Sequence, residues 1–427
     1  MRKGFYIVIL VFLSIITIFF QFNKIPVNID RDEIAFVRLA RSLNNKSYRI
    51  YTPQETGHST LYFYLLLTSF KLFGLNLWAL RIPAAIFGVL NGLFIYLIFD
   101  LVFREKIKFK FRRLIFLMPV GFILALIFIT LRWQFNFARF AYEATFLLFL
   151  ELGSIYCLIR ALKKQNILFV LICGIFAGLA FNSYTPGRIF FLLPLIILFI
   201  DKKTRILIFY YALACLPFII PLVIALIHNP EPRVVDELIL LDRNLDFIGK
   251  SVILLQNITK NIFMIFVIGD MNGRHNYPGK PALNPILSLF LIAGYLFSLK
   301  EKKNIYWKMF SIYFLLSLIP TLFTLPKGNP NMLRTYTLIP SIIYFIGIAL
   351  NKISSSMSFW QVELKTRRVQ NLIVICFFLL LSVSSFYELR TYFKFQKEVT
   401  KYSFEVRKSF EWLKERNFEL VDTWYKY

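Results

Sequence analysis

Two adjacent carboxylates open a short amphipathic segment directly after the first long apolar run of the chain. The stretch NIDRDEIAFVRLAR, residues 28–41, contains Asp32 and Glu33, and its apolar residues recur at helical spacing. On a helix over residues 31–43, Asp32 shares the face of the apolar stripe and points toward the protein body. A second face carries three arginines, namely Arg31, Arg38 and Arg41.

Two interpretations of Asp32 follow from this pattern. A carboxylate in the first turn of a helix stabilises it by roughly 1 kcal/mol, as a cap and through the helix dipole. A carboxylate held on an inward-facing stripe is also suited to act as an active-site acid or base that removes a proton from a hydroxyl group. The pattern leaves both interpretations open.

The composition places these residues beside a membrane. Of the 427 residues, 58% are hydrophobic and only 17% are charged, whereas soluble domains have about 25% charged residues. The apolar residues form blocks near the length that crosses about 30 Å of hydrocarbon. We expect an all-α integral membrane protein with eleven spans, near residues 4–22, 82–103, 114–131, 143–161, 167–182, 189–200, 206–227, 284–299, 306–325, 335–350 and 371–388.

The basic loops predict how these spans are oriented. With eleven spans, the clusters REKIKFKFRR, RALKKQN, DKKTR, KEKKN and ELKTRR all fall on the side of the N-terminus, which positive-inside bias places in the cytoplasm. The pattern holds only if residues 61–73 and 252–268 do not cross, so both are expected to be interfacial or re-entrant helices on the outer face. The formal net charge of +26 is then a topological feature of an inner or plasma membrane protein and does not indicate nucleic-acid binding.

This topology predicts a transmembrane domain over residues 1–388 with two large extracytoplasmic elaborations, residues 23–81 and 228–283. Residues 389–427 are expected to form a small extracytoplasmic helical appendage. The first elaboration contains the amphipathic helices, including the one that carries Asp32.

An ordered series of motifs resembles the GT-C class of polyprenyl-phosphate-sugar-dependent glycosyltransferases, which includes the protein O-mannosyltransferases and the lipid A aminoarabinose transferases. After the Asp-Glu pair, the series consists of GHSTLYFYL (57–65), FGLNLWALRIPAAIFGVL (73–90), FNFARFAYEATFLLFLELG (135–153), GIFAGLAFNSYTPGRIFFLLP (174–194), GDMNGRHNYPG (269–279) and NPNMLRTYTLIP (329–340). Each motif alone is weak, and the resemblance rests on their order over roughly residues 1–350.

The resemblance implies a GT-C-like bundle and an inverting transfer of a monosaccharide from a polyprenyl-phosphate carrier to a lipid, glycan or protein acceptor on the extracytoplasmic face. It implies that Asp32 is catalytic, with Glu33 beside it. Many relatives have Lys-Pro-Pro where this chain has Gly57-His58-Ser59. His58 either takes over the phosphate contact of that lysine or is a polar residue at a helix start.

The departing phosphate gains charge, which favours arginine and histidine donors. The outer-face residues expected to contact the donor are Arg81, Arg139, Glu143, Tyr184, Arg188, Arg274, His275 and Arg334. Charges at span ends are also common snorkelling anchors. Arg139 and Glu143, four residues apart, would equally form a local ion pair on one helix face. Gly174 and Gly178 are expected to allow close helix packing.

The residues indicate no cofactor. The histidines lack the spacing of a zinc site, so a divalent metal is not expected, and the expected partners are the lipid-linked donor, the acceptor and membrane lipids. Two alternatives stay open, a polymerase or ligase of lipid-linked glycans and a lipid or sugar transporter. A transporter should carry inverted repeats and ionisable groups at mid-span, whereas the polar residues here gather in the outer loops.

Overall fold

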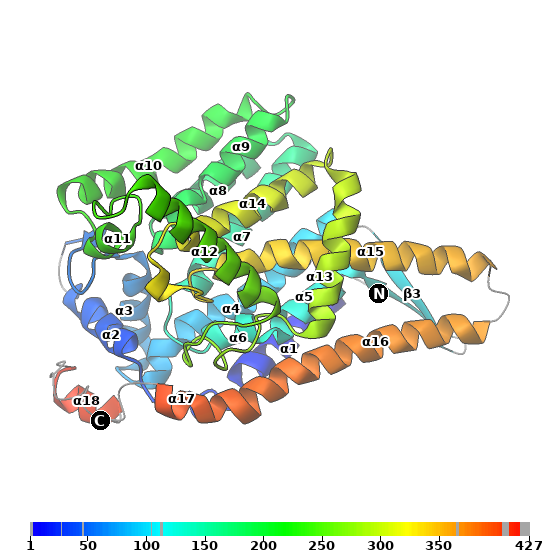
Figure 1. Cartoon of the computed structure of the whole chain (residues 1–427), viewed down its shortest axis with the longest axis horizontal. Coiled ribbons are helices and arrows are strands. Elements are labelled where there is room, and N and C mark those ends of the chain that lie inside the picture. Colours follow the sequence, from blue (N-terminus) through cyan, green and yellow to red (C-terminus); the bar gives the residue numbers. More distant parts are fainter. Residues whose placement is uncertain are drawn as a thin grey trace.

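The computed structural model shows a mostly helical bundle in which long helices lie side by side (Figure 1). It describes residues 3–418 apart from residues 27, 45–46, 104, 112–113, 364–366 and 404–409. Each of the eleven apolar ranges expected as spans contains a helix. These helices are α1 (Lys3–Phe19), α4 (Leu77–Val102), α5 (Val120–Thr130), α7 (Ala144–Lys164), α8 (Ile167–Phe181), α9 (Leu192–Ile200), α10 (Leu207–His228), α13 (Pro285–Ser298), α14 (Ile305–Leu322), α15 (Ile339–Glu363) and α16 (Arg367–Arg390).

Five helices of the described chain are long and apolar enough to cross a membrane, by length and composition: α4, α7, α10, α14 and a stretch over Tyr336–Ile353 that includes the start of α15. Shorter apolar helices, α1 and α8 among them, accompany these. The chain therefore has the character of a multi-pass membrane protein, and the count of eleven spans stays a prediction.

Asparagine caps begin several helices of the bundle. Asn76, Asn166 and Asn304 each accept a hydrogen bond from a backbone N–H in the first turn of α4, α8 and α14, respectively. Such caps satisfy N–H groups that have no partner within the helix. The sequence therefore defines where these helices start as well as which of their faces are apolar.

The close helix packing expected from two glycines is confirmed. A Cβ atom on Gly174 would lie 2.7 Å from the carbonyl oxygen of Tyr211, and one on Gly178 would lie 2.9 Å from that of Cys215. Both glycines belong to α8, which packs along α10. Only a residue without a side chain allows the two backbones to approach this closely.

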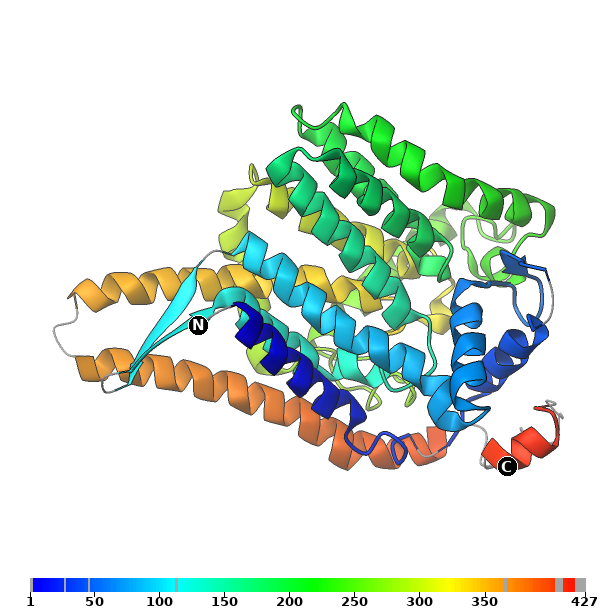
Figure 2. The same cartoon turned by 180° about the vertical axis from the view of Figure 1, so that it is seen from behind.

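The shorter elements gather at one end of the bundle, on the left of Figure 1 and the right of Figure 2. They include α2 (Arg31–Ser42), the small pair β1 (Tyr51–Thr52) and β2 (His58–Ser59), α3 (Leu61–Phe73) and α11 (Pro232–Glu237). The expected helix over residues 61–73 is α3, and α12 (Phe247–Phe266) occupies the second range expected not to cross. A short helix, α6 (Arg132–Phe137), and a 3₁₀ turn, η1 (Thr185–Ile189), connect the longer helices.

The chain is mostly helical, as expected, but the opposite end of the bundle departs from an all-α fold. There β3 (Lys106–Phe111) and β4 (Leu114–Pro119) form an antiparallel hairpin, so the expected span 114–131 is helical only from Val120. The sequence KIKFKF alternates lysine with apolar residues, which is the two-residue period of a strand. The lysines expected only as topological charges therefore lie on a strand.

The C-terminal segment continues the bundle. Helix α16 runs through the expected boundary at residues 388–389 and passes into a π-helix, Thr391–Gln396, and then α17 (Lys397–Ser403). After this, α18 (Phe410–Glu415) lies near α2, where Arg41 donates a hydrogen bond to Asn417 at 2.7 Å. The tail thus contacts the helix that carries Asp32.

Candidate functional site

Helix α2 is capped by Asp30, two residues before the expected cap. Asp30 occupies the N-cap position in extended backbone, and its own N–H donates to the Glu33 carboxylate at 3.1 Å. The interpretation of Asp32 as the cap is therefore wrong, because Asp32 is already the second residue of the helix. Its side chain is 49% exposed, so Asp32 does not follow the apolar stripe into the core.

Glu33 is buried and forms an ion pair with Arg81. Its two oxygens accept hydrogen bonds from Arg81 Nε at 2.8 Å and Arg81 Nη2 at 2.7 Å, and both side chains are almost fully buried. The backbone N–H groups of Asp30 and Ala141 each donate one further hydrogen bond to the Glu33 carboxylate. Arg81 also donates to the carbonyls of Pro26 and Asn28 at 2.8 Å. Neither side chain lines a cavity described below, so the structure shows a buried pair away from those cavities, and the expected roles of Glu33 in catalysis and of Arg81 in donor binding stay predictions.

A second acid–arginine cluster lies on the other side of the start of α2. Asp30 Oδ2 accepts hydrogen bonds from Tyr142 at 2.8 Å and from Arg274 Nη1 at 2.6 Å. The same two donors reach Asp32 Oδ2 at longer distances, 3.4 Å from Tyr142 and 3.3 Å from Arg274. The shorter bonds therefore go to the buried Asp30, and Asp32 is held more loosely at the edge of the cluster.

The cluster changes the acidity of its members. Desolvation and the neighbouring charge of Asp32 raise the pKa of Asp30 to about 6, against the lowering effects of Arg274 and Tyr142. Burial raises the pKa of Tyr142 well above its ordinary value, so its hydroxyl remains a donor. Desolvation by itself lowers the pKa of Arg274, but Tyr142, Asp30 and Asp32 outweigh it, and the pKa ends above its ordinary value. Arg274 is therefore a permanent cation.

Asp32 and Arg274 line a cavity of about 580 Å³, which we call the central cavity. Its walls come from the start of α2, the loop before β2, the turn before α7, α11 and two loops that precede α13 and α15. The predicted site residues that line it are Asp32, His58, Glu143, Tyr184, Arg274, His275 and Arg334. The structure thus brings together seven residues from six separate stretches of the sequence.

Two histidines of the central cavity have acidic neighbours. His275 Nδ1 lies 2.8 Å from Asp270 Oδ2, which also accepts the N–H of Met332 at 2.9 Å. His58 Nδ1 lies 3.8 Å from the Glu143 carboxylate. Both rings are thereby held at the wall of the cavity.

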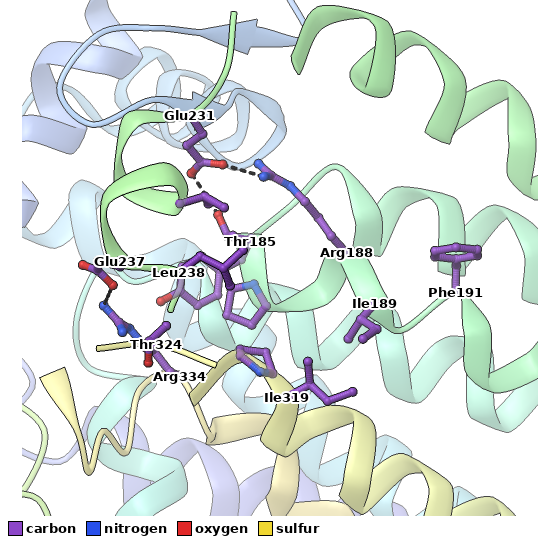
Figure 3. A pocket seen from close by; sticks show the side chains of 14 residues that line it. Thr185, Arg188, Ile189, Phe191, Glu231, Glu237, Leu238, Ile319, Thr324 and Arg334 are labelled. Carbon is purple, nitrogen blue, oxygen red and sulfur yellow. Dashed lines mark hydrogen bonds and ion pairs between the residues drawn. The ribbon is translucent and has the colours of Figure 1, made fainter. Parts of the chain in front are cut away.

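An adjoining cavity of about 360 Å³, the lateral cavity, is lined mainly by apolar residues of η1, α11 and the end of α14 (Figure 3). Its polar groups form two ion pairs, Arg188 with Glu231 at 2.5 Å and Arg334 with Glu237. Tyr184, Glu237 and Arg334 line both cavities. Arg188 therefore belongs to the lateral cavity, and Arg334 lies where the two cavities meet.

Arg139 lines neither the central nor the lateral cavity, and its expected ion pair with Glu143 is absent among the described contacts. The residues between them form turns, so they do not share a helix face. The Arg139 guanidinium is buried and donates to four carbonyls after and at the end of α1, those of Ile18, Phe20, Gln21 and Ile25. It also lies over the rings of Phe22, Tyr392 and Phe393. Arg139 thus ties the first helix to the C-terminal segment.

Sequence reasoning missed several polar residues of the site. Asp30 and Asn272 accept hydrogen bonds from Arg274, Tyr142 donates to Asp30, and the Asp270 carboxylate lies beside His275. Glu231 and Glu237 pair with the arginines of the lateral cavity. In the part of the chain that the structure describes, no three His, Cys, Asp or Glu side chains are grouped as for a metal ion, and the expectation that no metal is needed stays a prediction.

Comparison with known proteins gives one family-model match and several structural matches. Residues 57–226 match the family model described as dolichyl-phosphate-mannose-protein mannosyltransferase. The oligosaccharyltransferase of Archaeoglobus fulgidus, solved with a tethered acceptor peptide, superposes with a TM-score of 0.58 over 99% of this chain at 15% identity. The ArnT protein of Cupriavidus metallidurans, solved with undecaprenyl phosphate, superposes with a TM-score of 0.51 over 94% of this chain at 11% identity. The comparison with curated proteins gives no match.

These matches confirm the resemblance to GT-C glycosyltransferases that the sequence motifs indicated. The chain spans 60% of the length of the archaeal oligosaccharyltransferase and 78% of that of ArnT. A further structure of the archaeal enzyme, with an inhibitory peptide and a dolichol-phosphate, superposes with a TM-score of 0.56 over 98% of this chain and 59% of its own at 17% identity. At these identities the matches show the fold.

Proposed function

With the GT-C fold as the premise, we propose that the chain is an inverting membrane glycosyltransferase. It would move a monosaccharide from a polyprenyl-phosphate carrier to a hydroxyl group of a lipid, glycan or protein acceptor. The observation that carries the proposal is Asp32, a half-exposed carboxylate at the wall of the central cavity, which shares three lining residues with the mainly apolar lateral cavity. Reaction and lipid binding would therefore occupy adjoining spaces.

In this mechanism Asp32 is the general base. The acceptor hydroxyl attacks the anomeric carbon from the side opposite the phosphate, the bond from that carbon to the phosphate oxygen breaks, and the hydroxyl proton passes to Asp32. A carboxylate near the anomeric carbon also stabilises the positive charge that develops there. Arg274 and Tyr142 position Asp32 at 3.3 and 3.4 Å, distances that leave its negative charge less neutralised than that of Asp30.

Arg334 is placed to bind the leaving phosphate. It lines both cavities, so a phosphate at their junction would meet its guanidinium while the prenyl chain lies among the apolar residues of the lateral cavity (Figure 3). Its present partner, Glu237, is 35% exposed and can turn toward water when the phosphate arrives. Solved relatives hold undecaprenyl phosphate and dolichol-phosphate, which supports a lipid-phosphate donor here.

The other residues of the central cavity would surround the sugar. His275, His58 and Glu143 present polar groups from three sides of the wall, and Tyr184 lies at the boundary with the lateral cavity. Hydrogen bonds from such groups to sugar hydroxyls would fix which monosaccharide enters. We place these residues in substrate binding and keep the base role for Asp32.

We also propose that the end of the bundle with the cavities faces away from the cytoplasm, with the N-terminus inside. The basic loops support this orientation, because the N-terminus lies near β3 at the opposite end of the bundle from α18 (Figure 2). A reporter fused after Lys303 should be cytoplasmic and one at Tyr427 extracytoplasmic. If both reporters lie on the same side, the expected odd number of spans between Lys303 and Tyr427 is wrong.

The reaction is tested by incubating purified protein in lipid nanodiscs with radiolabelled polyprenyl-phosphate sugars and membrane extracts. The proposal expects the label to move from the carrier to an acceptor, with release of polyprenyl phosphate. A transporter in vesicles would move the label across the bilayer with the sugar–phosphate bond intact. A polymerase or ligase of lipid-linked glycans would instead produce a ladder of labelled products or transfer a preassembled chain, and either result would contradict a single monosaccharide transfer.

A further inference from the structure

A third cavity lies on the arginine face of α2. It measures about 760 Å³ and is lined by Arg38 and Arg41 of α2, by Gln54 and Glu55 of the loop before β2, and by Asn417 after α18. We call it the arginine cavity. Its lining is largely polar, and it includes neither Asp32 nor any residue of the lateral cavity.

Glu55 connects this cavity to the reaction site. It lines both the central and the arginine cavity, so the two spaces meet at its side chain. The backbone of Glu55 has a φ of 59°, which lies in the left-handed region that residues other than glycine rarely adopt. Residues held in such conformations are found at functional sites more often than elsewhere.

The arginines of the cavity are only partly neutralised. Arg38 Nη1 lies 3.3 Å from Glu55 Oε1, with 43% of the arginine side chain exposed. Arg41 Nη1 donates to Asn417 Oδ1 at 2.7 Å, which is an uncharged partner. Two guanidinium groups therefore face one carboxylate, and the surplus positive charge suits an anion.

From these observations we propose that the arginine cavity binds an anionic group of the acceptor, a phosphate or a carboxylate, while the acceptor hydroxyl reaches Asp32. This proposal rests on the proposed function. Arg38 and Arg41 follow Asp32 by six and nine residues on one helix, which corresponds to about 9 and 14 Å along its axis at 1.5 Å per residue. The acceptor would span that distance, crossing Glu55.

Glu55 would then select against neutral acceptors. In the empty site its carboxylate occupies Arg38, and an entering anion displaces it because a phosphate or carboxylate can bind a guanidinium through two hydrogen bonds. A neutral acceptor cannot compete in this way. Glu55 would act on acceptor binding without touching the reacting atoms, so it is a specificity residue.

The test compares binding of octyl glucoside 6-phosphate and octyl glucoside by titration calorimetry, with the protein in nanodiscs of neutral lipid. The phosphorylated compound should bind roughly 10-fold more tightly, as expected for a charge-assisted hydrogen bond at a partly exposed site. Arg38→Gln and Arg41→Gln should each remove most of this preference. Glu55→Gln should increase it several-fold by freeing Arg38, a change of opposite sign that a merely structural role would not produce.

Arg243→Gln is the matched control, because Arg243 is an exposed arginine of the second outer loop that lines none of the three cavities. It should leave the preference unchanged. An unaltered preference in Arg38→Gln and Arg41→Gln would overturn the proposal. So would a loss of affinity for the polyprenyl-phosphate donor in those variants, because it would assign the cavity to the donor.

Two further measurements separate the sources of failure. Repeating the titration in nanodiscs with phosphatidylglycerol tests bulk lipid headgroups, and loss of the phosphate preference there, restored in neutral lipid, would assign the cavity to membrane lipid and overturn the acceptor role. The titration needs no sugar donor. If no donor is ever used by the protein, the proposed function fails, whereas the anion preference still stands or falls on its own measurement.

Discussion

The start of α2 carries two acid–arginine contacts that involve adjacent residues and differ in burial, in distance and in the number of hydrogen bonds. Glu33 accepts two hydrogen bonds from Arg81 and two from backbone N–H groups, and water has no access to the pair. Asp32 is half exposed and shares Arg274 with a second carboxylate at a longer distance. The Glu33 carboxylate has all of its hydrogen-bond positions filled by the protein, whereas the Asp32 carboxylate keeps an exposed part that a ligand can reach.

This difference separates a structural acid from a chemical one. A buried carboxylate whose lone pairs are all occupied cannot accept a proton from a substrate without breaking its existing contacts. A carboxylate at a cavity wall with longer contacts keeps its basicity and its access. The same sequence motif, Asp-Glu, thus supplies one residue to the site and one to the fold.

The largest expected effect comes from Asp32→Asn. Asparagine keeps the size of the side chain but removes the base, so the rate of sugar transfer should fall by about 10²–10⁴-fold. The melting temperature should stay close to that of the wild type, because Asp32 is not the N-cap and is half exposed. Near wild-type transfer by a stable Asp32→Asn protein would remove the proposed mechanism.

Glu33→Gln should show the opposite pattern. The amide presents an NH₂ group to the guanidinium of Arg81, so one bond of the buried pair is lost and the arginine charge is left uncompensated. Breaking a buried pair costs about 3–5 kcal/mol, and we expect a large fall in the melting temperature, measured in detergent at fixed protein concentration.

A double-mutant cycle with Arg81→Met sharpens this second prediction. Removing both charges should restore part of the stability lost in Glu33→Gln, because no unpaired charge is then buried. A stable but inactive Glu33→Gln protein would instead place Glu33 in the chemistry and erase the contrast with Asp32. The sequence placed Glu33 beside Asp32 in the chemistry, whereas the buried pair with Arg81 favours a role in stability.

The motif order and the apolar blocks were enough to predict the helical bundle, helices at 61–73 and near 252–268, and seven of the residues that line the central cavity. The sequence did not predict which side chains pair with one another. The partners of Glu33 and Arg274 are 48 and 244 residues distant, and helical periodicity carries no information at that range. It also could not show that Asp30 is the N-cap of α2, since Asp30 and Asp32 are equally good caps by residue type.

Arg334→Gln tests a third acid–arginine contact, intermediate between the first two. Arg334 is paired with Glu237 but reaches both cavities, so we expect the KM for the lipid-linked donor to rise roughly 10-fold through loss of a charge-assisted contact worth about 1.5–3 kcal/mol. Arg274→Gln and His275→Ala should weaken donor binding less selectively, because Arg274 also positions Asp32. Unchanged donor affinity in all three variants, with Arg243→Gln as the control, would exclude them from donor binding.

The smallest expected effect concerns Asp30, which links the two contacts. Burial raises its pKa to about 6, from 3.8 for an exposed aspartate. Since the folded chain holds this proton more tightly, the contribution of Asp30 to stability is fully present below about pH 4 and is lost as the pH rises through about 6. Below pH 6 the protonated Asp30 releases Arg274, which then binds Asp32 more strongly and weakens it as a base.

The transfer rate should therefore fall as the pH drops below about 6, which gives the pH profile an acid limb. The apparent pKa of this limb belongs to the coupled pair Asp30 and Asp32. Asp30→Asn imitates the protonated state at every pH, so at pH 7.5 we expect a rate lower by a few-fold and the loss of the limb near pH 6. The melting temperature of this variant should also vary less between pH 4 and 6 than that of the wild type. A limb that persists unchanged in Asp30→Asn would show that Asp30 does not control Asp32, and Arg274 would then serve Asp32 independently of its buried neighbour.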